Sequence, residues 1–137
     1  MHLVPFPKSI QSLTGRPIDT GTFSATFAFA PSKRFKRSIQ SFPFLEIDAA
    51  DSNCSWIELE LSNEVAGAEA YKLSIQIHSI NLKASSETGL YRGLSTLQQI
   101  IKNESNALPR MLIDDQPDLK VRGYMLDISR CKVPKIQ

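Results

Sequence analysis

The sequence has little of what metal centres and common catalytic sites require. Its 137 residues include two histidines, His2 and His78, and two cysteines, Cys54 and Cys131, with no close spacing among them. Zinc sites use about four such ligands at short, characteristic spacings, so we expect no metal ion and no cofactor. No serine or cysteine stands in a recognisable nucleophile turn, so the sequence gives no sign of a catalytic triad. One disulfide between the two cysteines is compatible with the sequence.

Long apolar runs and a strong charge excess are also absent. No apolar stretch approaches the ~18 residues of a membrane span, and the first residues do not have the pattern of a signal peptide. The 16 basic and 14 acidic residues give a net charge of +2, so we expect no nucleic acid and no membrane as partner. The compartment stays undetermined.

One basic stretch stands out, Lys33 to Arg37, with Phe35 as its single aromatic residue. Nucleic-acid modules interleave several stacking aromatics with their basic residues. The pattern therefore favours a solvated helix face, and a phosphate or polyanion patch is the alternative.

Hydrophobic periodicity predicts an α+β fold, in a chain long enough for one domain of ordinary size. Alternation with period two predicts strands at residues 22–29, 56–61, 71–77 and 80–84. We expect the last three to form an antiparallel meander within a mostly antiparallel sheet that has one polar face. Two helices, at about 32–40 and 86–103, are expected to cover the other face.

The second predicted helix has the clearest signals. Ser86 is a suitable N-cap, and the helix carries a single apolar stripe made by Leu90, Leu94, Leu97 and Ile101. Gly89 and Gly93 lie one turn apart inside it, where each glycine costs about 1 kcal/mol relative to alanine. We expect this cost to be offset by a close approach of the helix to the sheet.

The C-terminal part differs in character. Met111–Ile113 and Val121–Ile128 are expected to be strands, joined by a turn over Asp114–Asp118. The second has a continuous apolar centre, Tyr124 to Leu126, which is typical of strands covered on both faces, as in barrels. Little sequence follows to cover it, so we expect residues 119–137 to begin a second domain and to favour self-association of this chain when exposed.

These segments also carry a family resemblance. Residues 89–100, GLYRGLSTLQQI, resemble the helix of the small domain that precedes the catalytic barrel in glycoside hydrolase family 20, the β-N-acetylhexosaminidases. The matching motifs that follow are Leu108-Pro109, Asp115-x-Pro117, Arg122-Gly123 and Asp127-x-x-Arg130, and the opening Leu3-Val4-Pro5-x-Pro7 is similar to the family's start.

The resemblance implies a small α+β domain over residues 1–118 and the first strand of a truncated (β/α)8 barrel over 119–137. It implies a parent enzyme that removes terminal N-acetylglucosamine or N-acetylgalactosamine with retention, through the substrate's own acetamido oxygen. Arg130 matches the arginine that holds sugar hydroxyls, whereas Asp127 and Arg122 match structural positions. The family's catalytic Asp-Glu pair lies further into the barrel, so we expect no catalytic residue in this chain. The alternatives are a stand-alone carbohydrate- or polyanion-binding module and a scaffold protein.

Overall fold

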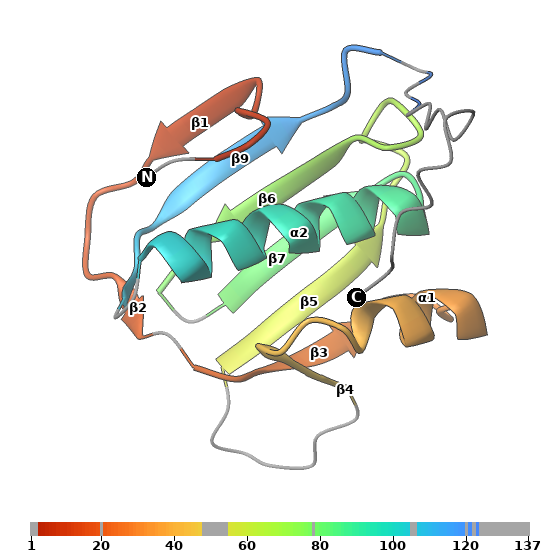
Figure 1. Cartoon of the computed structure of the whole chain (residues 1–137). Helices are drawn as coiled ribbons and strands as arrows, with labels where there is room; N and C mark the ends of the chain where they lie inside the picture. The colour runs from red at the N-terminus through yellow and green to blue at the C-terminus, as the bar shows by residue number, and fades with distance from the viewer. Residues whose placement is uncertain are drawn as a thin grey trace, which may run out of the picture.

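The alternating segments form a seven-stranded sheet in the computed structural model, which describes residues 3–19, 21–47, 55–77, 79–104, 107–119, 121 and 123. The strand order is β1-β9-β6-β7-β5-β3-β4, and two short strands, β2 and β8, pair separately (Figure 1). The strands are β1 Ser9–Ser12, β2 Ile18–Asp19, β3 Phe23–Phe27, β4 Leu45–Ile47, β5 Ser55–Leu61, β6 Tyr71–Ile75, β7 Ser79–Ala84, β8 Ala107–Leu108 and β9 Met111–Asp115. The helices are α1 Lys33–Ile39 and α2 Glu87–Asn103.

The α+β fold is confirmed, and so is the antiparallel pairing of β6 with β7, but the place predicted for β5 in an antiparallel meander is wrong. Strand β5 does not neighbour β6; it pairs in parallel with β7, and β6 lies on the far side of β7, antiparallel to it. β3 also pairs in parallel with both β4 and β5, so the sheet is mixed rather than mostly antiparallel. Period-two alternation shows which side chains share a face, but it carries no information about strand order or direction.

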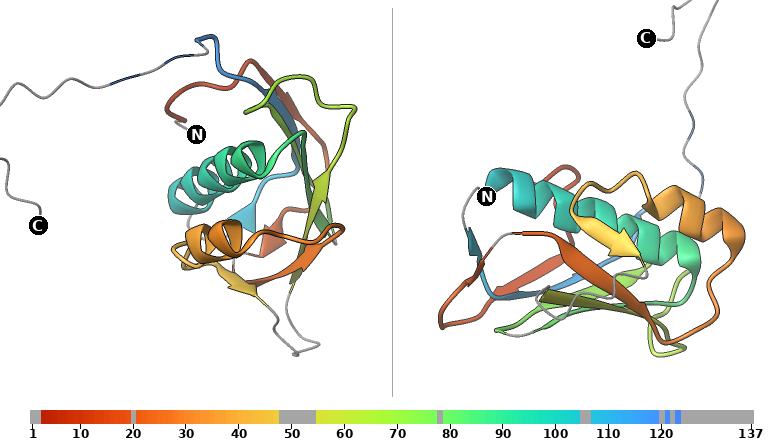
Figure 2. Two further views of the ribbon diagram at one scale, coloured as in Figure 1. Left: turned by 90° about the vertical axis from the view of Figure 1, so that its right-hand side faces the viewer. Right: turned by 90° about the horizontal axis from the view of Figure 1, so that it is seen from below.

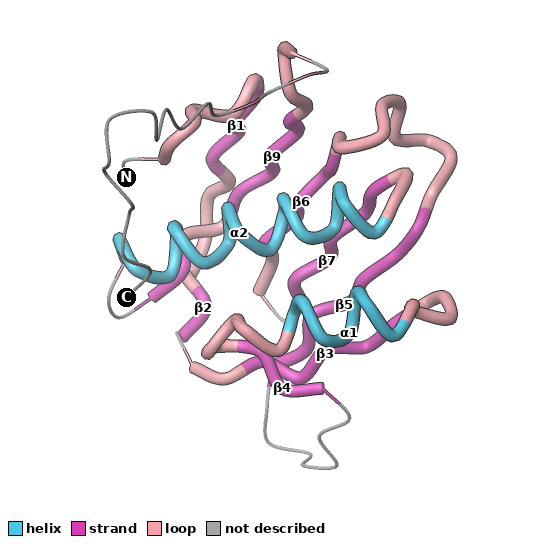
Figure 3. Tube along the Cα trace, turned by 45° about the vertical axis from the view of Figure 1, so that its right-hand side comes forward, coloured by secondary structure: helices cyan, strands magenta, loops and turns pink. Residues whose placement is uncertain are grey.

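Both helices cover one face of this sheet, as predicted (Figure 2). Ser32 is the N-cap of α1 and accepts a hydrogen bond from the Phe35 N–H at 3.1 Å, and Ser86 caps α2 in the same way. Figure 3 shows the two helices side by side in front of the strands. The core between the layers includes the fully buried Phe23, Ile39, Ile57, Leu59, Leu73, Ile75, Ile80, Leu82, Leu90, Leu94, Leu97 and Ile100.

The two glycines of α2 lie where the helix packs tightly against the sheet side. A Cβ on Gly89 would lie 2.5 Å from the Ala70 carbonyl oxygen and 2.8 Å from the Ala84 Cβ. A Cβ on Gly93 would overlap the side chain of Leu82. The expected close approach is therefore confirmed.

The opposite face of the sheet is polar. Lys83 forms an ion pair with Glu60 at 2.8 Å, and Lys72 lies 3.6 Å from Asp114 on the neighbouring strand. Trp56 is 43% exposed on this side. The predicted charged side chains therefore lie on this face of β5, β7, β6 and β9, and the exposed Trp56 and Leu112 lie among them.

The C-terminal predictions have different outcomes. Asp114 and Asp115 belong to β9 rather than to a turn, because their backbone pairs with β1 and β6. Of the expected strand at 121–128, Val121 and Gly123 are described and lie outside any strand. The remainder of that segment, and Arg130 with it, lies outside the described residues.

Candidate functional site

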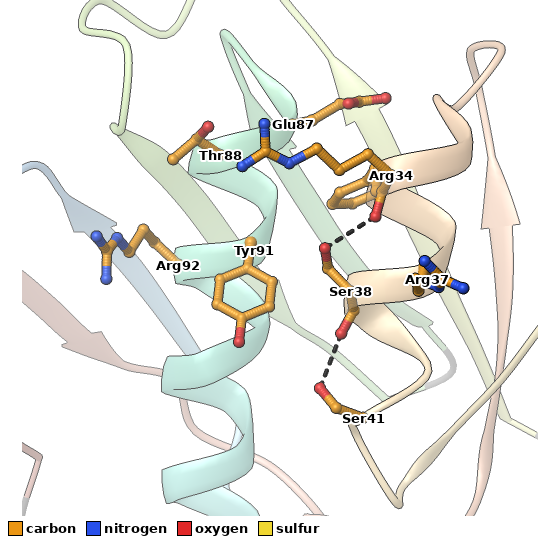
Figure 4. A pocket seen from close by; sticks show the side chains of 9 residues that line it. Arg34, Arg37, Ser38, Ser41, Glu87, Thr88, Tyr91 and Arg92 are labelled. Carbon is orange, nitrogen blue, oxygen red and sulfur yellow. Dashed lines mark hydrogen bonds between the residues drawn. The ribbon is translucent and has the colours of Figure 1, made fainter.

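A groove separates α1 from α2 on the helix side of the domain. Its volume is about 660 Å³. It is lined by Arg34, Phe35, Arg37, Ser38, Ser41, Glu87, Thr88, Tyr91 and Arg92 (Figure 4). Figure 4 shows Arg34 reaching from α1 toward Thr88 and Glu87, and the Tyr91 ring in the gap between the helices. The groove thus combines guanidinium groups, hydroxyls, one carboxylate and the aromatic rings of Phe35 and Tyr91.

Two hydrogen bonds between residues distant in the sequence join the start of α1 to the start of α2. The Ser32 N–H and hydroxyl each donate to a carboxylate oxygen of Glu87, both at 2.6 Å. Glu87 stands in the first turn of α2, so its charge lies near the N-termini of both helices, where a negative charge is stabilising. Phe42 and Tyr91 add a ring contact, with centroids 5.3 Å apart. The walls of the groove are thereby fixed relative to each other.

The basic stretch that the sequence highlighted is divided by the fold. Phe35 is buried in the core, and the Lys36 ammonium lies 5.9 Å from the centre of the Phe27 ring. Only Arg34 and Arg37 of its basic residues line the groove. The five residues therefore do not form one continuous basic surface.

A second hollow, of about 480 Å³, lies at the other flank of α2. Its walls come from the N-terminal segment, α2 and the chain that follows β9. The Gln99 side chain accepts from the Val4 N–H at 2.9 Å and donates to the Val4 carbonyl at 3.1 Å. Lys8 forms an ion pair with Asp118 at 2.8 Å. Arg92 lines this hollow and the groove alike.

A polar cluster lies at the base of this hollow. The Tyr71 hydroxyl is 2.6 Å from the Thr96 hydroxyl and donates to an Asp115 carboxylate oxygen at 3.3 Å. Burial raises the pKa of Tyr71 well above its usual range, so the phenol remains protonated and able to donate. Sequence reasoning missed this cluster, because Tyr71 is also an ordinary member of the inward-facing apolar positions of its strand.

The carboxylates that line the two hollows have partners within the domain. Glu87 is occupied by Ser32, and Asp115 accepts from Tyr71 and from the Lys8 N–H. Among the described residues, no three histidine, cysteine, aspartate or glutamate side chains gather as metal ligands. Over the same part of the chain, no helix is long and apolar enough to cross a membrane.

The predicted sugar-binding residue, Arg130, is not placed by the structure. The same holds for Asp127, Arg122, His78 and both cysteines, which all lie outside the described residues. Glu58 and Glu60 lie on β5, away from both hollows.

Comparison with known proteins identifies the family. A family model described as glycosyl hydrolase family 20, domain 2, matches residues 1–116. Beta-hexosaminidase subunit A1 of Dictyostelium discoideum is 30% identical over an alignment of 153 positions, which covers 98% of this chain and 28% of that protein. A beta-hexosaminidase of Vibrio furnissii is 27% identical over an alignment of 151 positions, which covers 95% of this chain and 22% of the relative.

A solved structure shows the same fold. The GH20 β-N-acetylhexosaminidase of Streptomyces coelicolor superposes with a TM-score of 0.69 at 21% identity, over 90% of this chain and 28% of that one. This chain therefore spans less than a third of the length of each of these proteins. With the family model matched over residues 1–116, the chain belongs to glycoside hydrolase family 20.

Proposed function

We propose that residues 1–118 are the N-terminal domain of a β-N-acetylhexosaminidase and that residues 119–137 begin its catalytic (β/α)8 barrel. The observation that carries this proposal is the family match, which ends at residue 116, one residue beyond β9. Each relative is more than three times as long as the part that this chain matches, and the remainder has room for a barrel of about 250 residues.

The parent enzyme would hydrolyse terminal N-acetylglucosamine or N-acetylgalactosamine residues with retention, using the substrate's acetamido oxygen as nucleophile. Glycoside cleavage needs an acid to protonate the leaving oxygen. The described carboxylates at the two hollows, Glu69, Glu87, Asp115 and Asp118, are engaged by neighbours or exposed in the loop after β9. We therefore assign no catalytic role to this domain.

Arg130 is the one residue of this chain to which we assign substrate binding in the parent. A guanidinium group can bond two neighbouring hydroxyl oxygens at once and keeps its charge. Residues at the C-terminal ends of barrel strands form the active sites of such barrels, and Arg130 follows the expected first strand.

The test has two arms. The purified chain should show no turnover of a chromogenic N-acetylglucosaminide, whereas the parent, obtained by extending the reading frame, should be active. In the parent, Arg130→Lys keeps the charge but loses the two-point contact, so kcat/KM should fall about 10²-fold or more. Activity that stays with the purified chain through a second purification step would overturn the first arm, and an unchanged kcat/KM would overturn the role of Arg130.

A reading frame that stops after this domain would favour the stand-alone binding module instead. That hypothesis then requires polyanion binding by the chain, with affinity that falls steeply as salt is raised.

A further inference from the structure

Trp56 is the single tryptophan of the chain, and it lies on the face of the sheet opposite the helices, here called the outer face. Ile57, the next residue of β5, is fully buried, so the alternation of the strand turns the Trp56 side chain outward. No hydrogen bond or ring contact joins its indole to another described residue. The outer face therefore offers a large, flat apolar ring that carries an N–H donor.

Neutral polar side chains continue from Trp56 across the neighbouring strands. Ser79 is its cross-strand partner on β7, and the Gln76 N–H donates to the Ser79 carbonyl at 3.0 Å, so Gln76, directly after β6, extends the same row. Neighbouring strands lie about 4.8 Å apart, so this row is about 10 Å long, which is comparable to the length of a disaccharide. Asn81 and Ser74 are paired with each other in the adjacent row.

Hydrogen bonds within these rows orient the amide groups. The Gln76 Nε2 donates to the Ser74 Oγ at 3.1 Å, and the Asn81 Nδ2 donates to the Ser79 Oγ at 3.3 Å. A primary amide has two N–H groups and one carbonyl oxygen, so each of these amides keeps an N–H and its oxygen unused by the described residues. Donors and acceptors thus lie together beside the apolar ring.

The charges on the outer face favour a neutral ligand. Glu58 is exposed two positions after Trp56 on the same strand face. Lys83 and Lys72 lie further along the sheet, and each has a carboxylate partner, at 2.8 Å and 3.6 Å. A carboxylate beside the ring accepts hydrogen bonds from hydroxyl groups and repels an anion. The surface around Trp56 is therefore unsuited to an acidic polymer.

The path of the chain leaves this face open. Pro117 and Leu119, which follow β9, line the hollow beside α2 on the helix side. Trp56 lies on the other side of the sheet layer (Figure 2). A domain joined after Leu119 therefore starts on the helix side, and a ligand on the outer face does not compete with it.

From these observations we infer that Trp56, with Ser79, Gln76 and Asn81, binds a neutral saccharide chain of N-acetylhexosamine units. The apolar C–H face of a sugar ring stacks on the indole, and the amides pair with hydroxyl and acetamido groups. The identity of the sugar rests on the proposed function. A glycan held here stays close to the parent enzyme, which raises the effective concentration of its chain ends at the active site.

The test uses the fluorescence of the 137-residue chain, which reports on Trp56 alone because the chain has one tryptophan. The probe is a soluble oligosaccharide of β-linked N-acetylglucosamine. We expect the emission to shift to shorter wavelength and the indole to become protected from quenching by acrylamide. This titration needs no substitution, so it does not depend on the folding of a variant.

Calorimetry then compares the affinities of variants for the same oligosaccharide. Trp56→Ala should weaken binding about 10-fold or more, and Trp56→Phe, which keeps a smaller ring, should weaken it less. Leu112→Ala is the matched control, because Leu112 is apolar and 36% exposed on the same face but lies on β9, three strands away from β5 in the sheet. Its affinity should stay within about 2-fold of the unmodified chain.

Three results would overturn the inference. They are an emission that does not respond to the oligosaccharide, an unchanged affinity in Trp56→Ala, and equal binding of a glucose oligosaccharide, which lacks the acetamido groups. None of these measurements depends on turnover, so a failed titration leaves the proposed function standing. A parent without activity on amino sugars would overturn the proposed function and leave the measured binding in place.

Discussion

Replacing Gly89 by alanine gives a direct test of how α2 is seated. The new Cβ would lie 2.5 Å from the Ala70 carbonyl oxygen, and that backbone cannot easily move away. Ser85 and Ser86 donate side-chain hydrogen bonds to the carbonyls of Gly67 and Ala68, which ties the 67–70 turn to the start of the same helix. The clash must therefore be relieved by displacing both together.

The magnitude follows from two opposing effects. Alanine stabilises a helix interior by about 1 kcal/mol relative to glycine. Overpacking in a core costs about 1–3 kcal/mol, and contact with a fixed backbone atom belongs at the upper end. We expect Gly89→Ala to be destabilising by about 2 kcal/mol, which lowers the melting temperature of a domain of this size by roughly 6–10 °C.

Chemical and thermal denaturation of the 137-residue chain measure this effect. Gly21→Ala is the matched control, because a Cβ there has nothing within 4 Å, and its stability should change by less than about 1 kcal/mol. A Gly89→Ala chain as stable as the unmodified protein, or more stable, would refute the close approach of α2 to Ala70.

Two further predictions concern Tyr71 and the C-terminal residues. Tyr71→Phe should cost about 1 kcal/mol at pH 8, because the Thr96 and Asp115 side chains lose a buried hydrogen-bond partner. Burial raises the pKa of Tyr71 in the folded state. The contribution of the protonated phenol to the free energy of unfolding is therefore complete below the ordinary tyrosine pKa of about 10, and it is lost as pH rises beyond that value. The stability difference between the two chains should thus shrink above about pH 10, by at most about 1.4 kcal/mol per pH unit, and a constant difference from pH 8 to 11 would contradict this assignment. Removing residues 119–137 should leave the melting temperature of the chain nearly unchanged and should abolish its concentration-dependent association, measured by sedimentation. If the shortened chain unfolds, these residues belong to the small domain.

Local features of the fold could be predicted because their causes are local. Ser32 and Ser86 cap their helices through hydrogen bonds that reach only three residues along the chain. Alternation placed Ile57, Leu59, Leu73 and Leu82 on inward faces, where all four are buried. Gly89 and Gly93 predicted the close contact of α2 with the sheet side, because glycines inside a helix are costly unless a neighbouring element packs closely against them.

The predicted apolar stripe of α2 was right at three of four positions. Ile100 is fully buried, whereas Ile101 is partly buried against the core. Both residues lie near the last turn of the helix. Neighbouring residues of a helix point in different directions, so only one of the two can face the sheet fully.

The order of the strands in the sheet could not be predicted from the sequence. Pairing of β5 with β7 rather than β6 depends on which neighbour buries more apolar surface across the whole sheet, and alternation is identical in either arrangement. The groove and the hollow beside α2 could not be predicted either, because residues far apart in the sequence form them. Glu87 meets Ser32 across 55 positions, Gln99 meets Val4 across 95, and Tyr71 meets Asp115 across 44. The sequence by itself determined the faces, the helix ends and the family of this protein, because those are set by neighbouring residues and ordered motifs. Only the tertiary structure decided which distant side chains share a hollow, because that depends on long-range contacts that no short window of sequence contains.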